Sequence, residues 1–227
     1  MKKEFNVKGF NVRSFMVSGL TAKWGIGSPR DESYKKPLHA WTIKGRVDGS
    51  TNFTTLSDIS GNRVGMTLAG FTGTAGSGFE NGYLVFDGVK DSALTAPFTI
   101  EKDWTLVGEW KFLPTVLGSA GLIKPSSFFL YNDISGTITT FVNAGSGAFY
   151  VKEVGINAVC SDGRIYGKTW NEYLNNKPQT VTSSNGAMAI GRNGTKFVSM
   201  KFKNLAIYDR VLSESQCKKA YDWLQTQ

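Results

Sequence analysis

Apolar and polar residues alternate in short runs along most of the chain, and the clearest run covers residues 104–112. In this run Trp104, Leu106, Trp110 and Phe112 fall on one side of an extended strand, because successive side chains of a strand point to opposite faces. Turn-forming residues recur about every ten residues, a spacing typical of an antiparallel β-sandwich. Similar runs predict further strands at residues 83–88, 127–131, 137–142, 148–154, 187–191 and 197–208.

One helix is predicted, near residue 227. Ser213 can accept a hydrogen bond at the start of this helix, and Gln216, three residues later, completes a capping box. The apolar residues that follow have the spacing of one helical face, so we expect the helix to dock on the sandwich. These residues are Cys217, Ala220, Tyr221 and Leu224.

The first 37 residues have a different pattern, in which three units of five residues begin at Phe5, Phe10 and Phe15. Each unit reads Phe-x-Val-x-Gly/Ser, so Phe and Val of one unit share a face, but the odd period reverses that face at every unit. A single sheet cannot bury such a segment, and we predict an extended arm that docks on neighbouring subunits; an ordinary first strand of the sandwich is the alternative. The docking residues are Phe5, Val7, Phe10, Val12, Phe15 and Val17.

Positive charge is concentrated in the same part of the chain. The net charge is +8, and residues 1–46 carry ten basic and three acidic side chains, which leaves +1 for the other residues. This asymmetry favours an acidic partner surface for the arm, with a solvated basic tail as the alternative. We therefore divide the chain into a basic arm and linker, residues 1–37, and a sandwich, residues 38–227.

Composition adds limits on class and location. The chain has 227 residues, of which 41% are hydrophobic, and 26 are glycine, which suits one large all-β domain. No stretch approaches the roughly 18 to 20 apolar residues that span a bilayer. Lys2 and Lys3 are followed by polar residues, so we expect no signal peptide. Cys160 and Cys217 match no zinc or redox spacing and are expected to be free thiols, with a disulfide as the alternative.

Three stretches carry motifs in a recognisable order and spacing. Residues 58–63 read Asp-Ile-Ser-Gly-Asn-Arg, residues 84–91 include Phe-Asp-Gly-Val-Lys-Asp, and residues 190–213 end in Tyr-Asp-Arg-Val-Leu-Ser before the helix. Together they resemble the laminin G-like members of the concanavalin A-like lectin/glucanase superfamily, over roughly residues 38–227. The resemblance implies an all-β fold, a two-sheet antiparallel jelly-roll sandwich with one short C-terminal helix, here extended by the N-terminal arm.

The same resemblance raises the question of calcium. Members that hold calcium use acidic oxygen ligands, and Asp58, Asp87 and Asp91 are the remaining candidates here. Arg63 stands where the family usually has glycine, and the acidic pair that often precedes the last strand's end is replaced by Asn204 and its neighbours. We therefore expect no metal and no cofactor, with calcium as the alternative, and aspartates that cap turns through their own side chains.

No catalytic constellation emerges. Glucanases of this superfamily carry Glu-x-Asp-x-Glu on one strand, which places nucleophile and general acid about 5 Å apart. Residues 101–105 approach this pattern but end in Thr105, so one essential carboxylate is missing. A Ser-His-Asp or Cys-His site would depend entirely on His39, the only histidine. We expect the protein not to be an enzyme.

A candidate glycan site lies in a predicted loop at residues 170–176. Sugar recognition needs an aromatic plate for the ring face and polar groups for the hydroxyls. Trp170 and Tyr173 would form one exposed platform; the alternative is that both rings seal the edge of the core. The candidate ligand-binding residues are Trp170, Asn171, Glu172, Tyr173, Asn175 and Asn176.

These expectations combine into a non-catalytic, lectin-like adhesion or decoration protein. The chain is similar to laminin G-like domains encoded by bacteriophages, so we expect a virion component, made in the host cytoplasm and anchored to other virion or assembly subunits through residues 1–37. Cell-surface glycans are the expected ligands, copies of the chain are expected to assemble, and no nucleic-acid partner or membrane span is expected. The alternative is a purely structural virion or assembly cement protein that binds no sugar, or a cytoplasmic protein.

We expect residues 1–20 to show no hydrogen-exchange protection in the isolated protein and to gain protection on a partner, because the five-residue repeat offers a lone sheet no single face to bury. Hydrogen exchange of the purified chain, followed by mass spectrometry, measures this. Strong protection in the isolated chain would place the repeat inside the sandwich and contradict the docking hypothesis.

Overall fold

The chain divides into two compact units, Met1–Glu32 and Ser33–Gln227, in the computed structural model. In the first unit β1 (Met16–Val17) pairs antiparallel with β2 (Leu20–Thr21). The docking residues predicted between positions 5 and 15 lie outside the described residues, and for Val17 only the strand pairing is described. The structure describes residues 16–17, 20–21, 32–113, 121–123, 128–132, 140–144, 148–151, 155–174 and 184–227.

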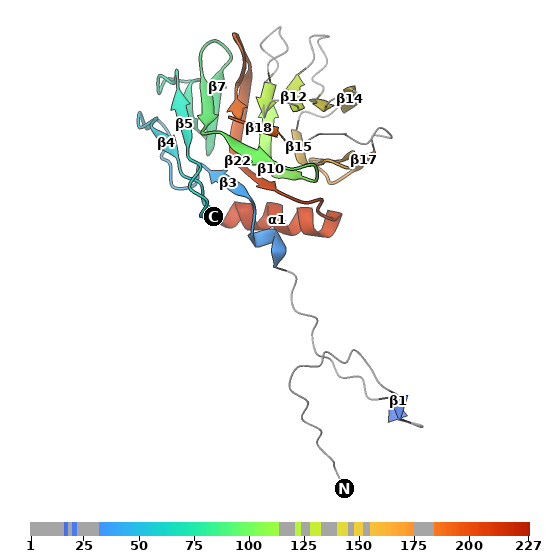
Figure 1. Ribbon diagram of the computed structural model, residues 1–227. Helices are drawn as coiled ribbons and strands as arrows, with labels where there is room; N and C mark the ends of the chain where they lie inside the picture. The colour runs from blue at the N-terminus through green and yellow to red at the C-terminus, as the bar shows by residue number, and fades with distance from the viewer. Residues whose placement is uncertain are drawn as a thin grey trace. The chain divides into compact units, whose positions relative to one another are not determined.

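The second unit is built on a large antiparallel sheet (Figure 1). Its strands follow the order β17-β16-β15-β10-β22-β7-β6, and β3 pairs with β22 beside β7. The strands are β3 (His39–Thr42), β6 (Gly78–Glu80), β7 (Tyr83–Asp87), β10 (Thr105–Phe112), β15 (Gly155–Cys160), β16 (Arg164–Gly167), β17 (Glu172–Leu174) and β22 (Ser199–Tyr208).

A second, four-stranded sheet has the order β19-β8-β5-β4, and a further four-stranded sheet has the order β11-β12-β13-β14. The strands of these two sheets are β4 (Thr55–Leu56), β5 (Met66–Ala69), β8 (Ser92–Thr95), β19 (Ala189–Ile190), β11 (Gly121–Ile123), β12 (Phe128–Asn132), β13 (Thr140–Ala144) and β14 (Ala148–Val151). Two further antiparallel pairs are β9 (Phe98–Ile100) with β18 (Ser184–Gly186) and β20 (Arg192–Asn193) with β21 (Lys196–Phe197).

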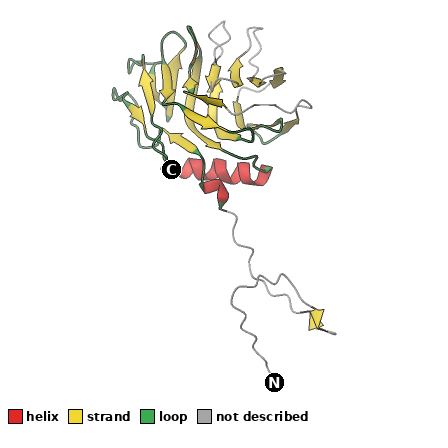
Figure 2. Ribbon diagram, in the orientation of Figure 1, coloured by secondary structure: helices red, strands yellow, loops and turns green. Residues whose placement is uncertain are grey.

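Helical structure in the second unit consists of the short η1 (Ser33–Lys35) and the helix α1 (Glu214–Thr226). Figure 2 shows α1 lying across one face of the large sheet. The predicted all-β antiparallel sandwich with a C-terminal helix is confirmed. No helix in the described part of the chain is long and apolar enough to cross a membrane.

The main core lies between the two sheets of the sandwich and follows from alternation along their strands. Leu106, Trp110 and Phe112 of β10 enter this core, as the period of two predicts, and Met66 and Leu68 of β5 enter it from the second sheet. All five side chains are at most 5% exposed. Burial of this apolar surface is the main driving force for the association of the two sheets.

A β-bulge interrupts the alternation in β22. Phe202 and Leu205 both enter the core although they are three residues apart, which requires one extra residue between them. Lys203 is that residue, because the pairing with β10 skips it. At the bulge the side-chain oxygen of Asn204 accepts a hydrogen bond from the backbone N–H of Glu109 at 2.9 Å, so this strand amide stays paired.

The outer face of the large sheet carries a second apolar cluster, which α1 covers. Ala206 and Tyr208 of β22 point to this face, in alternation with the core residues of the same strand, and meet Cys217, Ala220 and Leu224 of the helix. The apolar stripe predicted on the helix is therefore confirmed. Both central strands of the large sheet are buried on two sides where the helix lies.

The predicted capping box begins the helix. The hydroxyl oxygen of Ser213 accepts a hydrogen bond from the backbone N–H of Gln216 at 3.3 Å, and the side-chain oxygen of Gln216 accepts one from the backbone N–H of Ser213 at 2.8 Å. Both contacts satisfy amides that an α-helix leaves without partners at its first turn.

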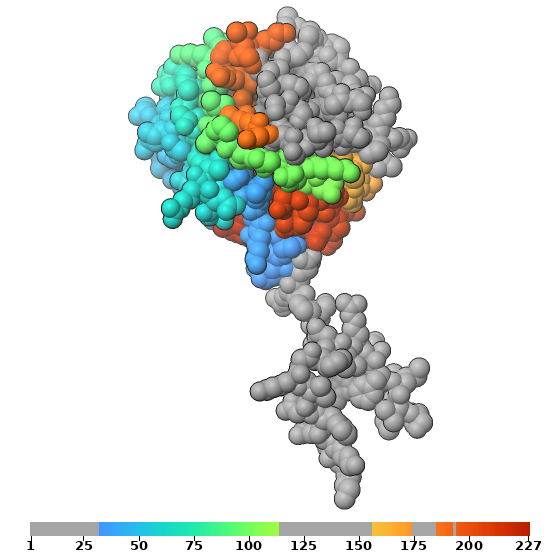
Figure 3. Space-filling model, in the orientation of Figure 1, coloured from blue at the N-terminus to red at the C-terminus, as the bar shows by residue number. Residues whose placement is uncertain are grey.

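Residues 33–37, which fall in the predicted arm, contact the sandwich. The hydroxyl of Tyr208 donates a hydrogen bond to the backbone oxygen of Tyr34 at 2.5 Å, and Arg210 donates one to that of Ser33 at 2.6 Å. On the surface, the first residues of the second unit, in blue, border the C-terminal residues, in red (Figure 3).

Strands β15 and β16 were not predicted. In β15 the side chains of Ile156 and Val159 enter the main core, whereas Ala158 and Cys160 enter the cluster under α1. A register shift opposite β10 and the buried polar Asn157 disturb the period of two that marks a half-buried strand. A strand that is buried on both faces gives no alternating signal in the sequence.

We expect Leu224→Ala to lower the free energy of unfolding by about 2 to 5 kcal/mol, because it removes a packed side chain and leaves a cavity. Leu224 is 1% exposed and lies between α1 and the sheet. Urea denaturation followed by fluorescence measures the change, and Lys219→Ala on the exposed side of the same helix is the matched control. Equal stability of the two variants would contradict the docking of α1.

Candidate functional site

Trp170, the first predicted sugar platform, packs between β16 and α1. Its backbone N–H donates to the oxygen of Gly167 at 2.9 Å, and its φ of 63° lies in the left-handed region. The ring is half-buried, with its centroid 6.1 Å from that of Tyr166 and, edge to face, 5.7 Å from that of Tyr221. The ammonium of Lys218 lies 5.7 Å from the indole centroid. The ring therefore closes the edge of the helix–sheet cluster.

Tyr173 packs elsewhere, against the main core between the sheets, and is also half-buried. The expectation that Trp170 and Tyr173 share one exposed platform is wrong, because the two rings belong to clusters on opposite faces of the large sheet. Asn171 and Glu172 are exposed, and Glu172 begins the edge strand β17. The other two candidate residues, Asn175 and Asn176, lie outside the described residues, and a role of the six residues in glycan binding stays a prediction.

Asp58, a candidate calcium ligand, organises the turn that follows β4. Its side chain is fully buried; one carboxylate oxygen accepts from the backbone N–H groups of Ala40 at 3.0 Å and Ser60 at 2.9 Å. The other oxygen accepts from Val64 N–H at 3.2 Å and lies 2.7 Å from Nδ1 of His39. Burial opposes ionisation, but these hydrogen bonds outweigh it and hold the pKa of Asp58 below its usual value.

Asp87 and Asp91 form the turn after β7. One oxygen of Asp87 accepts from the backbone N–H groups of Val89, Lys90 and Asp91 at 2.8, 3.0 and 3.1 Å. Asp91 is fully buried, accepts from Asp87 N–H at 3.0 Å, and has its pKa raised by burial. Asp58 and Asp87 thus cap turns, and no cluster of three His, Cys, Asp or Glu able to hold a metal occurs in the described ranges.

The residues that approach a glucanase motif lie at the start of β10 and just before it. Glu101 and Asp103 are exposed in the turn between β9 and β10. Thr105 is fully buried instead; its hydroxyl accepts from the backbone N–H of Leu212 at 2.9 Å and donates to the backbone oxygen of Arg210 at 2.9 Å. Thr105 therefore ties β10 to the segment that leads into α1.

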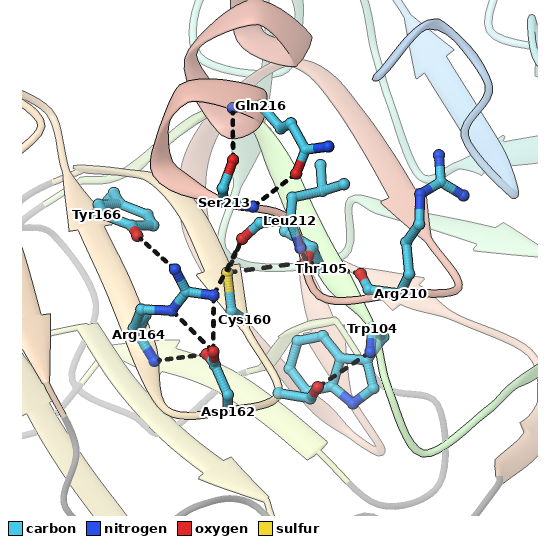
Figure 4. Close-up of polar contacts among 11 residues, drawn as sticks. Trp104, Thr105, Cys160, Asp162, Arg164, Tyr166, Arg210, Leu212, Ser213 and Gln216 are labelled. Carbon is cyan, nitrogen blue, oxygen red and sulfur yellow. Dashed lines mark hydrogen bonds and ion pairs between the residues drawn. The ribbon is translucent and has the colours of Figure 1, made fainter. Parts of the chain in front are cut away.

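Other polar residues hold the same segment (Figure 4). Arg164 donates to the backbone oxygen of Leu212 at 3.1 Å and forms an ion pair with Asp162 at 2.7 Å. The Cys160 thiol lies 3.9 Å from the same oxygen of Leu212. Both cysteines are free and buried, as predicted, and the hydrogen bond with the neighbouring Cys160, together with burial, raises the pKa of Cys217. This polar group positions the helix.

A cluster of charge that sequence reasoning missed lies on the outer face of the large sheet, beyond α1. The ammonium groups of Lys111, Lys201 and Lys203 lie 5.5, 5.9 and 6.0 Å from the ring centroid of Tyr83. We call these residues, together with Glu109, the lysine–tyrosine patch. The available signal was the alternation of β10 and β22, which places their charged residues opposite the core-facing ones.

Glu109 is the centre of hydrogen bonding in this patch. Its carboxylate accepts from the hydroxyl of Tyr83 at 2.5 Å, from the ammonium of Lys203 at 3.1 Å and from the hydroxyl of Tyr221 at 3.2 Å. Burial opposes ionisation of Glu109, but the bonds from Tyr83 and Lys203 lower its pKa. Burial and Glu109 together raise the pKa of Tyr83 to about 12, so this hydroxyl remains a donor.

Two of the grooves on the sandwich surface are lined by residues that the structure describes. One, of about 230 Å³, adjoins the lysine–tyrosine patch, and its walls include Lys44, Arg46, Gly82 and Lys203. The other, of about 440 Å³, lies on the outer face of the second sheet and is lined by small and hydroxyl-bearing residues together with Leu94 and Arg192. These residues are Thr55, Gly65, Thr67, Ala69, Ser92, Leu94, Thr95, Ala96 and Arg192.

No protein-family model matches the sequence, and no curated protein sequence matches it. Among solved structures, the sialidase of Trypanosoma rangeli in complex with sialic acid is similar, with a TM-score of 0.58 and 15% identity, over 81% of this chain and 32% of that one. The receptor-binding domain of a botulinum neurotoxin C/D mosaic serotype has a TM-score of 0.55 and 10% identity, over 86% and 52%.

The binding domain of Paraclostridial Mosquitocidal Protein 1 is similar to the same extent, with a TM-score of 0.53 and 10% identity, over 82% of this chain and 52% of that one. The chain thus spans about a third of the sialidase and about half of each binding domain. At these identities the likeness shows a shared β-sandwich fold.

We expect Asp58→Asn to lower the free energy of unfolding at neutral pH by about 1 to 3 kcal/mol, because buried backbone donors lose a charged acceptor. The folded-state pKa of Asp58 lies below its ordinary value of 3.8, so its contribution is complete above that pH and is lost as pH falls through the folded pKa. Urea denaturation of both proteins between pH 7 and pH 2 measures the difference, which should shrink at acid pH. A difference that is independent of pH would rule out this role of the charge.

Proposed function

We propose that this chain is a non-catalytic, glycan-binding β-sandwich that is carried on a larger assembly, a virion, through its N-terminal arm. The observation that carries the proposal is the shared fold with two domains that are described as binding domains, one of them from a botulinum neurotoxin, and with a sialidase in complex with sialic acid. The sandwich covers most of this chain, so binding would be its main task.

The residue at the start of β10, Thr105, supports the proposed lack of catalysis. Retaining glycoside hydrolysis needs two carboxyl groups about 5 Å apart that flank the scissile bond. Where the resemblance places the third acidic residue of the glucanase motif, the chain has Thr105, which is buried and bonded to Leu212 and Arg210. Its hydroxyl is occupied in holding the helix segment.

Attachment to an assembly is supported by the sequence of the arm. The Phe-x-Val-x-Gly/Ser repeat and the charge of +7 within residues 1–46 favour docking on an acidic neighbour, whereas the rest of the chain is nearly neutral. The motif resemblance to phage-encoded laminin G-like domains supports a virion as that assembly and the host cytoplasm as the place of synthesis.

We expect the purified full chain to bind a subset of glycans on an array and to release no sugar from the glycans that it binds. Weak sugar affinities call for multivalent display, because linked sites raise apparent affinity without new contacts. Chromatography of the bound glycan after long incubation detects hydrolysis, and the denatured chain is the control.

Two outcomes would overturn parts of this proposal. Release of a sugar would assign a catalytic activity and remove the non-catalytic role. Binding to no glycan, together with incorporation of the chain into particles, would favour a structural cement protein, for which the packed positions of Trp170 and Tyr173 already provide an argument.

A further inference from the structure

The lysine–tyrosine patch violates a pairing rule of β-sheets. Lys111 of β10 and Lys201 of β22 are direct cross-strand partners on the same outer face. Like charges in this arrangement repel each other and destabilise the sheet. Lys203 adds a third ammonium group within 6.0 Å of the same tyrosine ring. Such local conflicts persist in native proteins mainly where function requires them.

The positive charge of the patch is only partly neutralised. Glu109 is its one carboxylate, so three ammonium groups and one carboxylate leave a net charge of +2. Glu109 is also engaged by Lys203 and by the hydroxyls of Tyr83 and Tyr221. Within the described ranges no carboxylate lies within ion-pairing distance of Lys111 or Lys201. An anion at this position would relieve the repulsion.

The contacts within the patch order its side chains before any ligand binds. The ring of Tyr83 is fixed through its hydroxyl bond to Glu109, and its face attracts the three ammonium groups by cation–π interaction. Lys111, Lys201 and Lys203 are half-buried, so part of the entropic cost of ordering their side chains is already met in the free protein.

The groove of about 230 Å³ extends the patch, because Lys203 belongs to both. Arg46 is held at the wall of the groove, because it donates a hydrogen bond to the backbone oxygen of Thr55 at 2.5 Å and lies over the ring of Phe79. Lys44 donates a hydrogen bond to the backbone oxygen of Thr226 at 2.5 Å. A space of this size beside a cation cluster fits a sugar ring that carries an acidic group.

We propose that the lysine–tyrosine patch binds the carboxylate or sulfate group of an acidic glycan, while the adjoining groove of Lys44, Arg46 and Gly82 receives the sugar ring. This inference rests on the proposed function and names its ligand class. Nucleic acid fits less well, since its recognition uses an extended basic stripe that follows the phosphate backbone, whereas the patch has three lysines around one ring.

The test uses the full chain and matched sets of glycans in neutral, carboxylated and sulfated forms, with dissociation constants measured by biolayer interferometry. We expect the wild type to prefer an acidic form and the double variant Lys111→Gln/Lys201→Gln to bind it about tenfold more weakly or worse, because two charge-assisted contacts are lost. Lys90→Gln/Lys102→Gln removes the same charge at two exposed lysines outside the patch and should change binding less than twofold.

A second pair of variants tests the ring. Tyr83→Phe keeps the aromatic face and should retain most of the binding, whereas Tyr83→Ala removes the group that gathers the lysines and should lose it. Melting temperatures close to that of the wild type would show that the four patch and control variants are folded. Equal binding by Tyr83→Ala and the wild type would overturn the assigned site.

The remaining outcomes separate the two proposals. Binding of neutral glycans alone, unchanged in the double variant, would leave the glycan-binding function in place and overturn the acidic site. Binding of no glycan would overturn both. Polyglutamate and single-stranded DNA serve as further probes. If the patch variant and the control variant lost the same amount of affinity for these polyanions, binding would reflect general charge attraction and not a specific site.

Discussion

The bulge at Lys203 and Asn204 in β22 determines how the large sheet is arranged. On one side β22 pairs with β10 along almost its whole length, but on the other side it pairs with β7 before the bulge and with β3 after it. The extra residue keeps both halves of the strand facing the core. A Cβ at Gly108 in β10 would lie 2.4 Å from the backbone oxygen of Asn204, so the close approach of the strands here requires glycine.

The two halves of β22 have different outer faces as a result. After the bulge, Ala206 and Tyr208 are small or flat enough for α1 to pack on them, and Thr105 and the capping box hold the helix there. Lys201 before the bulge and Lys203 at the bulge occupy the same face, where charged side chains would oppose the docking of an apolar helix. One strand thus specifies both a covered surface and an open, charged surface.

The sequence predicted the elements whose side chains follow a simple period. Alternation located β10 and β22, and the capping box with its apolar stripe located α1. Strands β15 and β16 escaped prediction because apolar contacts on both faces and a register shift remove the period. At Arg63, where the motif resemblance leads us to expect glycine, the backbone adopts a left-handed φ of 61°.

The candidate site was harder to predict, because sites are made by residues from separate strands. Trp170 and Tyr173 are close in sequence, but the turn before β17 sends their rings to opposite faces of the sheet. Tyr83, Lys111 and Lys201 are distant in sequence, and only the register of β7, β22 and β10 brings them together. No spacing rule within one segment reveals such a group.

Trp170 has an unfavourable backbone conformation, and the lysine–tyrosine patch has like charges on neighbouring strands. The structure explains only the first of these two features. The left-handed backbone of Trp170 is disfavoured for a bulky residue, yet packing on Tyr166 and Tyr221 offsets that cost. The cross-strand lysines gain only weak cation–π contacts on a half-exposed face. Since stability alone does not account for Lys111 beside Lys201, the open half of the large sheet is the stronger candidate for a binding surface than the turn at Trp170.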